Sequence, residues 1–381
     1  MTERIFVCKL GAINALHMPR KRANREHTKL FHSKGGNPMN KMLVGATAAI
    51  LTAVGLTAAS GAHATTLTFS NWLPPSHPIT TKMIEPWAAN VAKATDGRVT
   101  VKVLAKPMGK PPAHFDIAKD GLADVTLGVH GYQPGRFLLT QAAEMPFLGE
   151  SATDTSVAYW RIYKKYLEKA GEHKGVKVLS IFTHGPGNIF NAKRPINTLS
   201  DLDGLKIRVG GGVVNEVAKA LGVTALLKPA TKSYELMSNG VADGVFFPKE
   251  SIRSFKLTKL VRYATMVPGG LYNTSFFLVM NPGAFDKLPA ADQKAIMSVS
   301  GEAFARLAGQ GWDSADAWGV EGMQADGIQI QNASPALIDQ IRRKTAGIES
   351  AWVEAVKAKG IDGEAVMRDL RAEIKKVQAG N

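Results

Sequence analysis

The sequence predicts an α/β protein with two domains. Its 381 residues are 45% hydrophobic and 21% charged, a composition that can fill two cores of ordinary size. Short segments with alternating apolar side chains are followed by stretches with helical periodicity, which is the order that builds a parallel sheet covered by helices. Neither internal repeats nor a low-complexity linker divide the chain. We therefore expect two α/β domains that share the chain through several crossings.

Residues 1–64 are expected to lie outside this fold. From Met39 a short basic start and an apolar run lead to Ala62-His63-Ala64, the order of a secretory signal peptide that is cleaved after Ala64. A membrane anchor is the alternative, but glycine, serine and threonine interrupt the run, and its strongly apolar part is shorter than the ~20 residues of a span. Residues 1–38 are expected to be a mis-called upstream extension, because Lys34-Gly35-Gly36 can be encoded by a purine-rich stretch that resembles a ribosome-binding site.

Strands and helices alternate in the first half of the exported chain. The first segment, residues 66–70, alternates like a strand, and three prolines make the next loop rigid before an amphipathic helix. Two further strands with a short helix between them favour a parallel sheet, and a long helix then precedes a fourth strand. The expected strands are 66–70, 98–103, 123–129 and 176–182, and the expected helices are 79–94, 113–120 and 153–170.

Gly185-Pro186-Gly187 breaks the chain after the fourth strand and predicts a crossing between domains near residue 186. The alternation then resumes, and the helical stretch 290–323 is long enough to pass between domains. Two more helices close the chain. The expected strands are 189–193, 205–209, 245–247 and 275–280; the expected helices are one ending at 221 and those at 232–239, 290–323, 335–359 and 363–378.

Composition and motifs exclude several classes of function. The net charge of +15 includes +6 from residues 1–38, and the basic residues of 65–381 do not cluster with aromatic ones, so we expect no nucleic-acid partner. Cys8 is the only cysteine, which excludes an intramolecular disulfide and a cysteine metal site. The later histidines lack metal-ligand spacing, and the signatures of hydrolases, P-loops and dinucleotide folds are missing. We therefore expect no catalytic residue, metal or cofactor.

One local pattern is suited to binding an anion. Arg208 stands on an expected strand that leads through Gly210-Gly211-Gly212 into a helix. Glycines permit a tight turn, a helix N-terminus presents free N–H groups, and a guanidinium can bind a carboxylate through two parallel hydrogen bonds. A surface arginine beside a packing turn is the alternative. A nucleotide phosphate would fit the same geometry, although no P-loop lysine accompanies it.

Aromatic residues stand at several expected strand ends, which is where ligands bind in α/β sheets. A single aromatic residue at such a place more often fills the core, so only the set predicts a pocket. The set consists of Trp72, Tyr132, Phe246, Phe247 and Tyr272.

The segments 201–248 and 278–296 closely resemble the DctP-like solute-binding proteins of TRAP (tripartite ATP-independent periplasmic) transporters. An L-K-x-R-V strand containing Arg208, an E-L helix, a G-x-x-D-G turn and an N-x-x-x-F-x-x-L-P segment follow one another in the family's order. The resemblance extends over nearly all of residues 65–381.

This resemblance implies a two-lobed periplasmic-binding-protein fold, with hinge strands and a long interdomain helix, that closes on a carboxylate. The implied lobes are 65–185 with 275–315, and 186–274 with 316–381. Arg208 matches the arginine that holds the carboxylate in the family, and Asn273 matches a position that often adds a polar contact. The implied partners are a small organic acid and the small and large membrane permease subunits, and the implied location is the periplasm.

The sequence departs from the sialic-acid-type members of the family in two places. Asn188 stands where they have a second ligand-binding arginine, and Phe247 replaces a polar residue. A pocket with one cation and added aromatic surface favours an aromatic or hydrophobic monocarboxylate, or a 2-oxo acid with a hydrophobic tail, over a C4-dicarboxylate. Arg136 could turn inward as a substitute cation, in which case the ligand would be a C4-dicarboxylate after all.

Two other classes of function stay open. A periplasmic enzyme could use Arg208 to anchor a carboxylate, but the chain offers no nucleophile, paired acid and base, or metal site for it. A sensor that presents its closed form to a chemoreceptor would use the same binding chemistry as a transport receptor.

Overall fold

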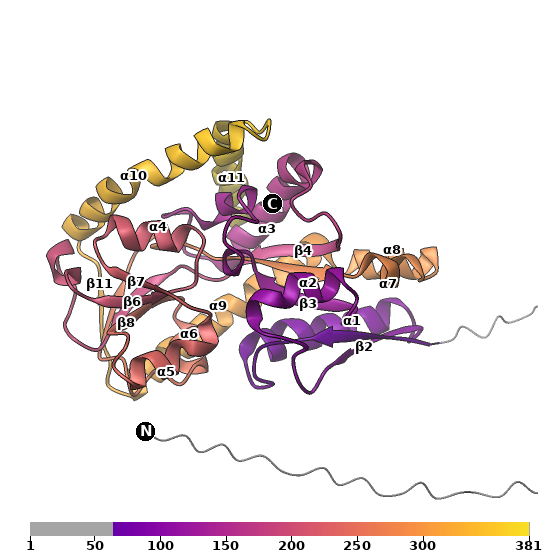
Figure 1. Cartoon of the computed structure of the whole chain (residues 1–381), viewed down its shortest axis with the longest axis horizontal. Coiled ribbons are helices and arrows are strands. Elements are labelled where there is room, and N and C mark those ends of the chain that lie inside the picture. Colours follow the sequence, from indigo (N-terminus) through magenta and orange to yellow (C-terminus); the bar gives the residue numbers. More distant parts are fainter. Residues whose placement is uncertain (1–63, 381) are drawn as a thin grey trace, which may run out of the picture. The chain divides into compact units, whose positions relative to one another are not determined.

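The computed structural model describes residues 64–380, so the expected signal peptide and upstream extension lie outside the described residues. Two sheets organise the described chain, and helices cover both (Figure 1). The first sheet contains β1 (Thr65–Ser70), β2 (Val99–Val103), β3 (Val125–Val129), β4 (Lys177–Thr183) and β10 (Ser275–Met280), in the order β2-β1-β3-β10-β4. The second contains β5 (Asn188–Asn191), β6 (Lys206–Val209), β7 (Thr224–Leu227), β8 (Gly244–Phe247), β9 (Tyr263–Met266) and β11 (Gln329–Asn332), in the order β11-β9-β5-β8-β6-β7.

The helices fall between these strands, as the alternating sequence pattern predicts. Short 3₁₀ and π segments extend several of them, including a π turn and a 3₁₀ turn that carry α3 on to Ala170. The α-helices are α1 (Glu85–Ala94), α2 (His114–Lys119), α3 (Ala152–Ile162), α4 (Val213–Ala220), α5 (Ser233–Ser238), α6 (Glu250–Ser254), α7 (Pro282–Asp286), α8 (Ala290–Ser298), α9 (Gly301–Ala325), α10 (Pro335–Lys357) and α11 (Gly363–Gln378). Within residues 64–380, no helix is both long and apolar enough to cross a bilayer.

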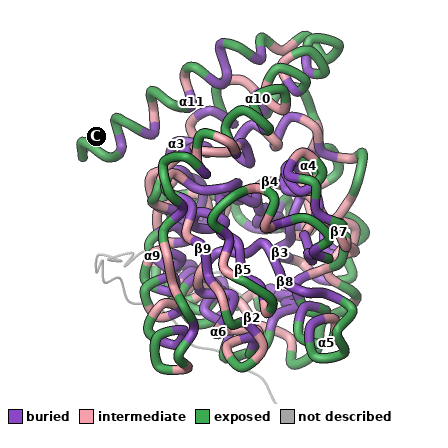
Figure 2. The backbone as a smooth tube through the Cα atoms, turned by 90° about the vertical axis from the view of Figure 1, so that its left-hand side faces the viewer, coloured by how far each residue is buried: buried purple, intermediate pink, exposed green. Residues whose placement is uncertain are grey.

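Both sheets mix parallel and antiparallel pairs. In the first, β1 pairs in parallel with β2 and β3, whereas β10 runs antiparallel between β3 and β4. In the second, β5 is antiparallel to both β8 and β9. Strands β5 and β10 each follow a crossing from one sheet to the other, and both run antiparallel to the strands beside them. The strands are largely buried, whereas α10 and α11 have many exposed turns (Figure 2).

Two neighbouring segments of the chain, residues 184–187 and 271–274, link the sheets. The segment after β4 and the segment before β10 are hydrogen bonded to each other, with His184 N donating to Thr274 O at 3.3 Å, Gly187 N to Tyr272 O at 2.8 Å and Leu271 N to Gly187 O at 2.9 Å. The break predicted at Gly185-Pro186-Gly187 therefore coincides with a paired hinge.

Helix α9 is attached to both halves of the described chain. Asp313 accepts hydrogen bonds from the first backbone N–H groups of α3, including Ala152 N at 2.7 Å, and Asp316 accepts from Glu250 N at the start of α6 at 2.9 Å. Carboxylates at helix N-termini are stabilised by the free N–H groups and by the helix dipole. Glycines let the helices approach closely, because a Cβ on Gly309 would lie 2.3 Å from Thr153 Cα and one on Gly319 would lie 2.5 Å from Lys249 O.

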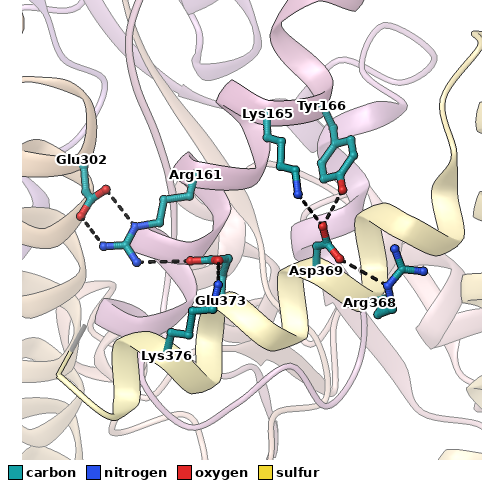
Figure 3. Close-up of polar contacts among 8 residues, drawn as sticks. All are labelled: Arg161, Lys165, Tyr166, Glu302, Arg368, Asp369, Glu373 and Lys376. Carbon is teal, nitrogen blue, oxygen red and sulfur yellow. Dashed lines mark hydrogen bonds and ion pairs between the residues drawn. The ribbon is translucent and has the colours of Figure 1, made fainter.

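The closing helix α11 packs on α3. Ion pairs cross this contact, Arg161 with Glu373 at 3.3 Å and Lys165 with Asp369 at 2.7 Å, and Arg161 also pairs with Glu302 of α9 at 2.8 Å (Figure 3). These side chains are partly exposed, and such pairs typically contribute 0 to about 1 kcal/mol each. The contact therefore depends mainly on the apolar face of α11, whose buried members include Val366, Leu370 and Ile374.

The structure differs from the sequence-based expectation in three respects. The expected helix 290–323 is divided into α8 and α9, because Gly301 has φ +56° and a Cβ there would lie 3.0 Å from the Trp160 ring. Strands β7, β9 and β11 were not expected, because none of them is an uninterrupted buried run: both end residues of each strand are exposed or half-buried. The short helices α6 and α7 were not expected either.

Gly309→Ala is expected to lower the free energy of unfolding by about 1–3 kcal/mol, because the added methyl group forces α9 away from the α3 backbone. Chemical denaturation followed by circular dichroism measures the change. Gly347→Ala in α10 is the matched control, since its Cβ would meet nothing within 4 Å. Alanine in a helix interior is better than glycine by about 0.5–1 kcal/mol, so this variant should be slightly stabilised. Equal effects of the two substitutions would contradict the packing argument.

Candidate functional site

A pocket lies between the two sheets, with about 440 Å³ of space among its walls when its open side is included. Residues from the strand ends of both sheets, from the paired hinge and from α9 form its wall. The lining residues are Trp72, Leu73, His77, Ile79, Val129, Tyr132, His184, Arg208, Gly210, Ala230, Phe247, Pro248, Glu250, Ser251, Phe255, Tyr272, Thr274, Phe276 and Trp312.

Arg208 provides the cation of this pocket. It lies on β6 with only 2% of its surface exposed, its Nε donates to Lys228 O at 2.8 Å, and its guanidinium lies 4.4 Å from the centre of the Phe247 ring. Burial lowers its pKa from the usual value, and none of the charged groups that act on it among the described residues is a carboxylate. A buried guanidinium without an anionic partner is unfavourable unless another molecule supplies the anion.

The glycine turn after β6 has a different role from the expected one. Val213 N, at the start of α4, donates to Glu144 Oε2 at 2.9 Å, so a carboxylate of the protein already occupies the helix N-terminus that was expected to help bind a ligand anion. A Cβ on Gly212 would lie 2.2 Å from that oxygen, and one on Gly211 would lie 2.2 Å from Gly131 O. The glycines are therefore needed for the close approach of the segment that follows β3.

Glu144 joins three parts of the chain that are distant in sequence. Besides Val213, it accepts hydrogen bonds from Ser275 N at 3.1 Å and Ser275 Oγ at 2.9 Å, at the start of β10. Burial raises the pKa of Glu144 to about 7, although these hydrogen bonds act in the opposite direction. The 3₁₀ segment Leu139–Glu144 before α3, helix α4 and the hinge end of β10 thus meet at one carboxyl group.

Aromatic rings form much of the remaining wall. Trp72 and Tyr132 are in edge contact at 5.9 Å, and Phe247 stacks on Phe255 at 5.7 Å. The polar ends of two of these residues are used within the protein: Trp72 Nε1 donates to Leu127 O at 3.0 Å, and Tyr132 OH accepts from Ala230 N at 2.9 Å. What these rings offer to the pocket is therefore mainly apolar surface.

The pocket brings together most, but not all, of the residues proposed from sequence. Trp72, Tyr132, Arg208, Gly210, Phe247 and Tyr272 lie on its wall.

Phe246, Asn188 and Asn273 do not line the pocket. Phe246 points to the opposite face of β8 from Phe247, as alternation along a strand requires, and its carbonyl accepts from Tyr272 OH at 2.9 Å. The Asn188 side chain is hydrogen bonded within the hinge: its Nδ2 donates to Pro186 O at 2.8 Å, and its Oδ1 accepts from Val267 N at 2.8 Å. The Asn273 amide lies 3.2 Å from His184 O and 3.3 Å from Gly185 O, so its NH₂ group joins the two hinge segments.

Arg136 does not turn into the pocket. Its Nη1 lies 2.9 Å from Asp116 Oδ1, and its guanidinium carbon is 4.0 Å from the centre of the Phe115 ring. A carboxylate and an aromatic face thus already hold this cation outside the pocket wall.

Sequence reasoning missed four notable wall residues, which are His77, His184, Glu250 and Trp312. His77 and Glu250 follow the ends of β1 and β8, so the strand-end rule that selected the aromatic residues could have found them. Trp312 belongs to α9, and no local pattern marks it. His184 stands in the hinge, where burial lowers its pKa to about 4 and keeps it uncharged at neutral pH.

Comparison with known proteins gives one consistent result. The family model described as bacterial extracellular solute-binding protein, family 7, matches residues 69–354. A protein of Comamonas testosteroni named outer membrane transporter protein TsaT is 32% identical, over 86% of this chain and 96% of its own.

Solved structures agree with this. A TRAP periplasmic solute-binding protein from Bordetella bronchiseptica, with (R)- and (S)-mandelate bound, has 49% identity and a TM-score of 0.80, over 82% of this chain and 99% of its own. A TRAP solute-binding protein from Rhodoferax ferrireducens T118, in complex with copurified benzoate, has 30% identity and a TM-score of 0.78, over 83% of this chain and 99% of its own.

Glu144→Gln is expected to change how stability depends on pH. Because burial raises the pKa of Glu144 from 4.5 to about 7, its contribution to stability is complete below pH 4.5 and is lost as the pH rises through 7. Glutamine does not titrate, so the stability of wild type relative to the variant should fall between pH 5 and pH 8. Thermal melts of both proteins across this range measure the difference.

Glu302→Gln provides the control for this experiment. Arg161 holds the pKa of Glu302 below its usual value, so the carboxylate is ionised in both folded and unfolded chains over the same pH range. The difference between this variant and wild type should therefore stay constant. A constant difference for Glu144→Gln as well would show that Glu144 does not titrate as described.

Proposed function

Because this chain belongs to family 7 of the bacterial extracellular solute-binding proteins, the solute receptors of TRAP transporters, we propose that it binds an aromatic monocarboxylate in the pocket around Arg208. The observation that carries the proposal is the buried guanidinium, which has no carboxylate partner among the described residues and faces aromatic walls. A carboxylate would supply the missing anion through two parallel hydrogen bonds.

The charges of the wall favour one carboxylate over two. Arg208 is the only lysine or arginine among the residues that line the pocket. His77 and His184 are kept neutral, since burial lowers the pKa of His77 to about 3 and that of His184 to about 4. A second carboxylate would have to be buried without a cation, which costs several kcal/mol, whereas an aromatic contact adds about 0.5–1.5 kcal/mol beyond area burial.

The bound molecules in similar structures support the same ligand class. The Bordetella relative holds mandelate and the Rhodoferax relative holds benzoate, each an aromatic ring with a single carboxylate. The family consists of binding receptors, and we propose no catalytic role. We further propose that the ligand is delivered to the small and large permease subunits of a TRAP transporter.

The family is periplasmic, and we propose that the exported chain starts at Thr65, after cleavage of a signal peptide that begins at Met39. We also propose lobes of residues 65–185 with 275–315 and of residues 186–274 with 316–381. Every strand of the first sheet falls within the former set and every strand of the second within the latter, which supports this division. Helix α11 reaches back to pack on α3 of the first lobe.

Arg208→Ala is expected to weaken binding of benzoate by about 100- to 10,000-fold, because breaking a buried ion pair from one side costs about 3–5 kcal/mol. Arg208→Lys should lose less, since it retains the charge but not the forked geometry. Isothermal titration calorimetry on ligand-free protein measures both. Arg136→Ala is the matched control and should bind as wild type does; unchanged binding by Arg208→Ala would remove this residue from the site.

A thermal-shift screen should rank aromatic monocarboxylates above C4-dicarboxylates. We expect benzoate, phenylacetate and mandelate to raise the melting temperature more than succinate, malate or fumarate at equal concentration, because the wall supplies one cation and several rings. An exclusive response to the dicarboxylates would refute the proposed ligand class. If that response disappeared in Arg136→Ala, the second cation would be identified.

A further inference from the structure

His77 and Glu250 form a second polar feature of the pocket wall, supplied by the loop after β1 and by the start of α6. Both are buried, with 3% of His77 and none of Glu250 exposed. His77 Nε2 and Glu250 Oε1 lie 3.6 Å apart, which is beyond a hydrogen bond. Neither atom has a hydrogen-bond partner among the described residues. The pocket therefore contains two adjacent polar atoms that no group of residues 64–380 satisfies.

The contacts of the His77 ring fix its role. Its Nδ1 accepts a hydrogen bond from Ile79 N at 3.2 Å, and the ring packs 5.2 Å from that of Phe255. Burial lowers the pKa of His77 to about 3, so the ring is neutral and its single proton resides on Nε2. His77 thus presents one unused N–H donor to the pocket.

Glu250 presents the complementary atom. Its Oε2 interacts with Ser254 Oγ, and its backbone N–H is bound to Asp316, which leaves Oε1 free. Burial, together with the nearby charge of Asp316, raises the pKa of Glu250 to about 8. An ionised carboxylate accepts at Oε1, and so does a neutral carboxyl group whose proton is on Oε2. Glu250 can therefore accept from a ligand in either state.

The two atoms together select one kind of group. A hydroxyl oxygen placed beside them can accept from His77 Nε2–H and donate to Glu250 Oε1 at the same time. An ammonium group has no lone pair for the histidine. An ionised carboxylate has no proton for the glutamate, and it is repelled whenever Glu250 is charged.

We propose that His77 and Glu250 form a hydroxyl-binding subsite, so that the ligand is an aromatic carboxylate bearing a hydroxyl group. This inference rests on the proposed function, because Arg208 is assumed to hold the carboxylate. The subsite determines specificity within that ligand class. An acid without the hydroxyl group leaves both polar atoms unpaired inside a closed pocket.

Calorimetry with matched ligand pairs tests the subsite. The pairs are benzoate with 3- and 4-hydroxybenzoate, and phenylacetate with mandelate, titrated into ligand-free protein. We expect at least one hydroxylated acid to bind about tenfold more tightly than its parent, because its hydroxyl group forms two additional hydrogen bonds with His77 and Glu250. His77→Phe keeps an aromatic ring beside Phe255 but removes the donor, so it should abolish this advantage while changing the affinity for the parent acid by less than about threefold.

Glu250 supplies an independent pair of variants. Glu250→Gln keeps an oxygen that accepts and should retain the preference for the hydroxylated acid, whereas Glu250→Leu, of similar size, should lose it. These variants decide the question even if His77→Phe does not fold. Arg136→Ala, outside the pocket, should leave the affinities for both members of each pair unchanged.

The possible failures are distinguishable. If no aromatic acid binds, the proposed function itself is wrong. If the parent acids bind and hydroxylation gives no advantage in wild type, the receptor proposal survives and the hydroxyl subsite is overturned. The subsite is also overturned if His77→Phe and Glu250→Leu lower the affinities for the parent acid and for the hydroxylated acid by the same factor. A purely structural role of the two residues predicts that result.

Discussion

The central physical constraint of the site is that Arg208 is buried without a carboxylate partner among the described residues. A guanidinium inside a protein needs hydrogen bonds and a compensating charge. The described residues meet part of this need through Lys228 O, the face of the Phe247 ring and the side chain of Tyr132. Arg208 lines a pocket whose other basic side chains are neutral histidines. A carboxylate bound there would supply the compensating charge that the described residues do not.

Closure around that arginine depends on contacts made far from it. Glu144 connects the segment before α3 to α4 and β10, and α9 binds the starts of α3 and α6 through Asp313 and Asp316. Backbone approaches at Gly131 and Gly211 allow no side chain between them. The pocket wall is therefore supported by acids and glycines that are not among the residues lining the pocket.

The sequence predicted those parts of the site that local rules govern. Most of the aromatic wall was predicted because ligands bind at strand ends, and the same rule would have reached His77 and Glu250. Arg208 was predicted from the strand and glycine turn around it and from the family resemblance. Alternation along β8 separates Phe246 from Phe247, but which of the two faces the pocket depends on how the sheet is covered. The two-domain α/β fold and the crossing near residue 186 followed from periodicity and from one glycine–proline turn.

Other features depend on partners that are distant in sequence, and no local pattern contains them. Glu144 meets Val213 across 69 positions and Ser275 across 131, so its occupation of the α4 N-terminus could not be read from the glycines beside that helix. The sequence could not exclude Arg136 as a second cation of the pocket. Its contacts with Asp116 and Phe115, which place it outside the pocket wall, are visible only in the structure.

The position of β10 has a consequence for the order in which the chain can fold. This strand, Ser275–Met280, lies between β3 and β4, so β4 has no partner strand in the first sheet until residue 280 has been synthesised. Until then β3 and β4 present bare edges, and unpaired edges are what neighbouring chains join during aggregation. The second sheet likewise waits for β11, at Gln329–Asn332, to cover β9. Each sheet is therefore completed only by a strand that comes late in the chain, after a segment that belongs to the other sheet.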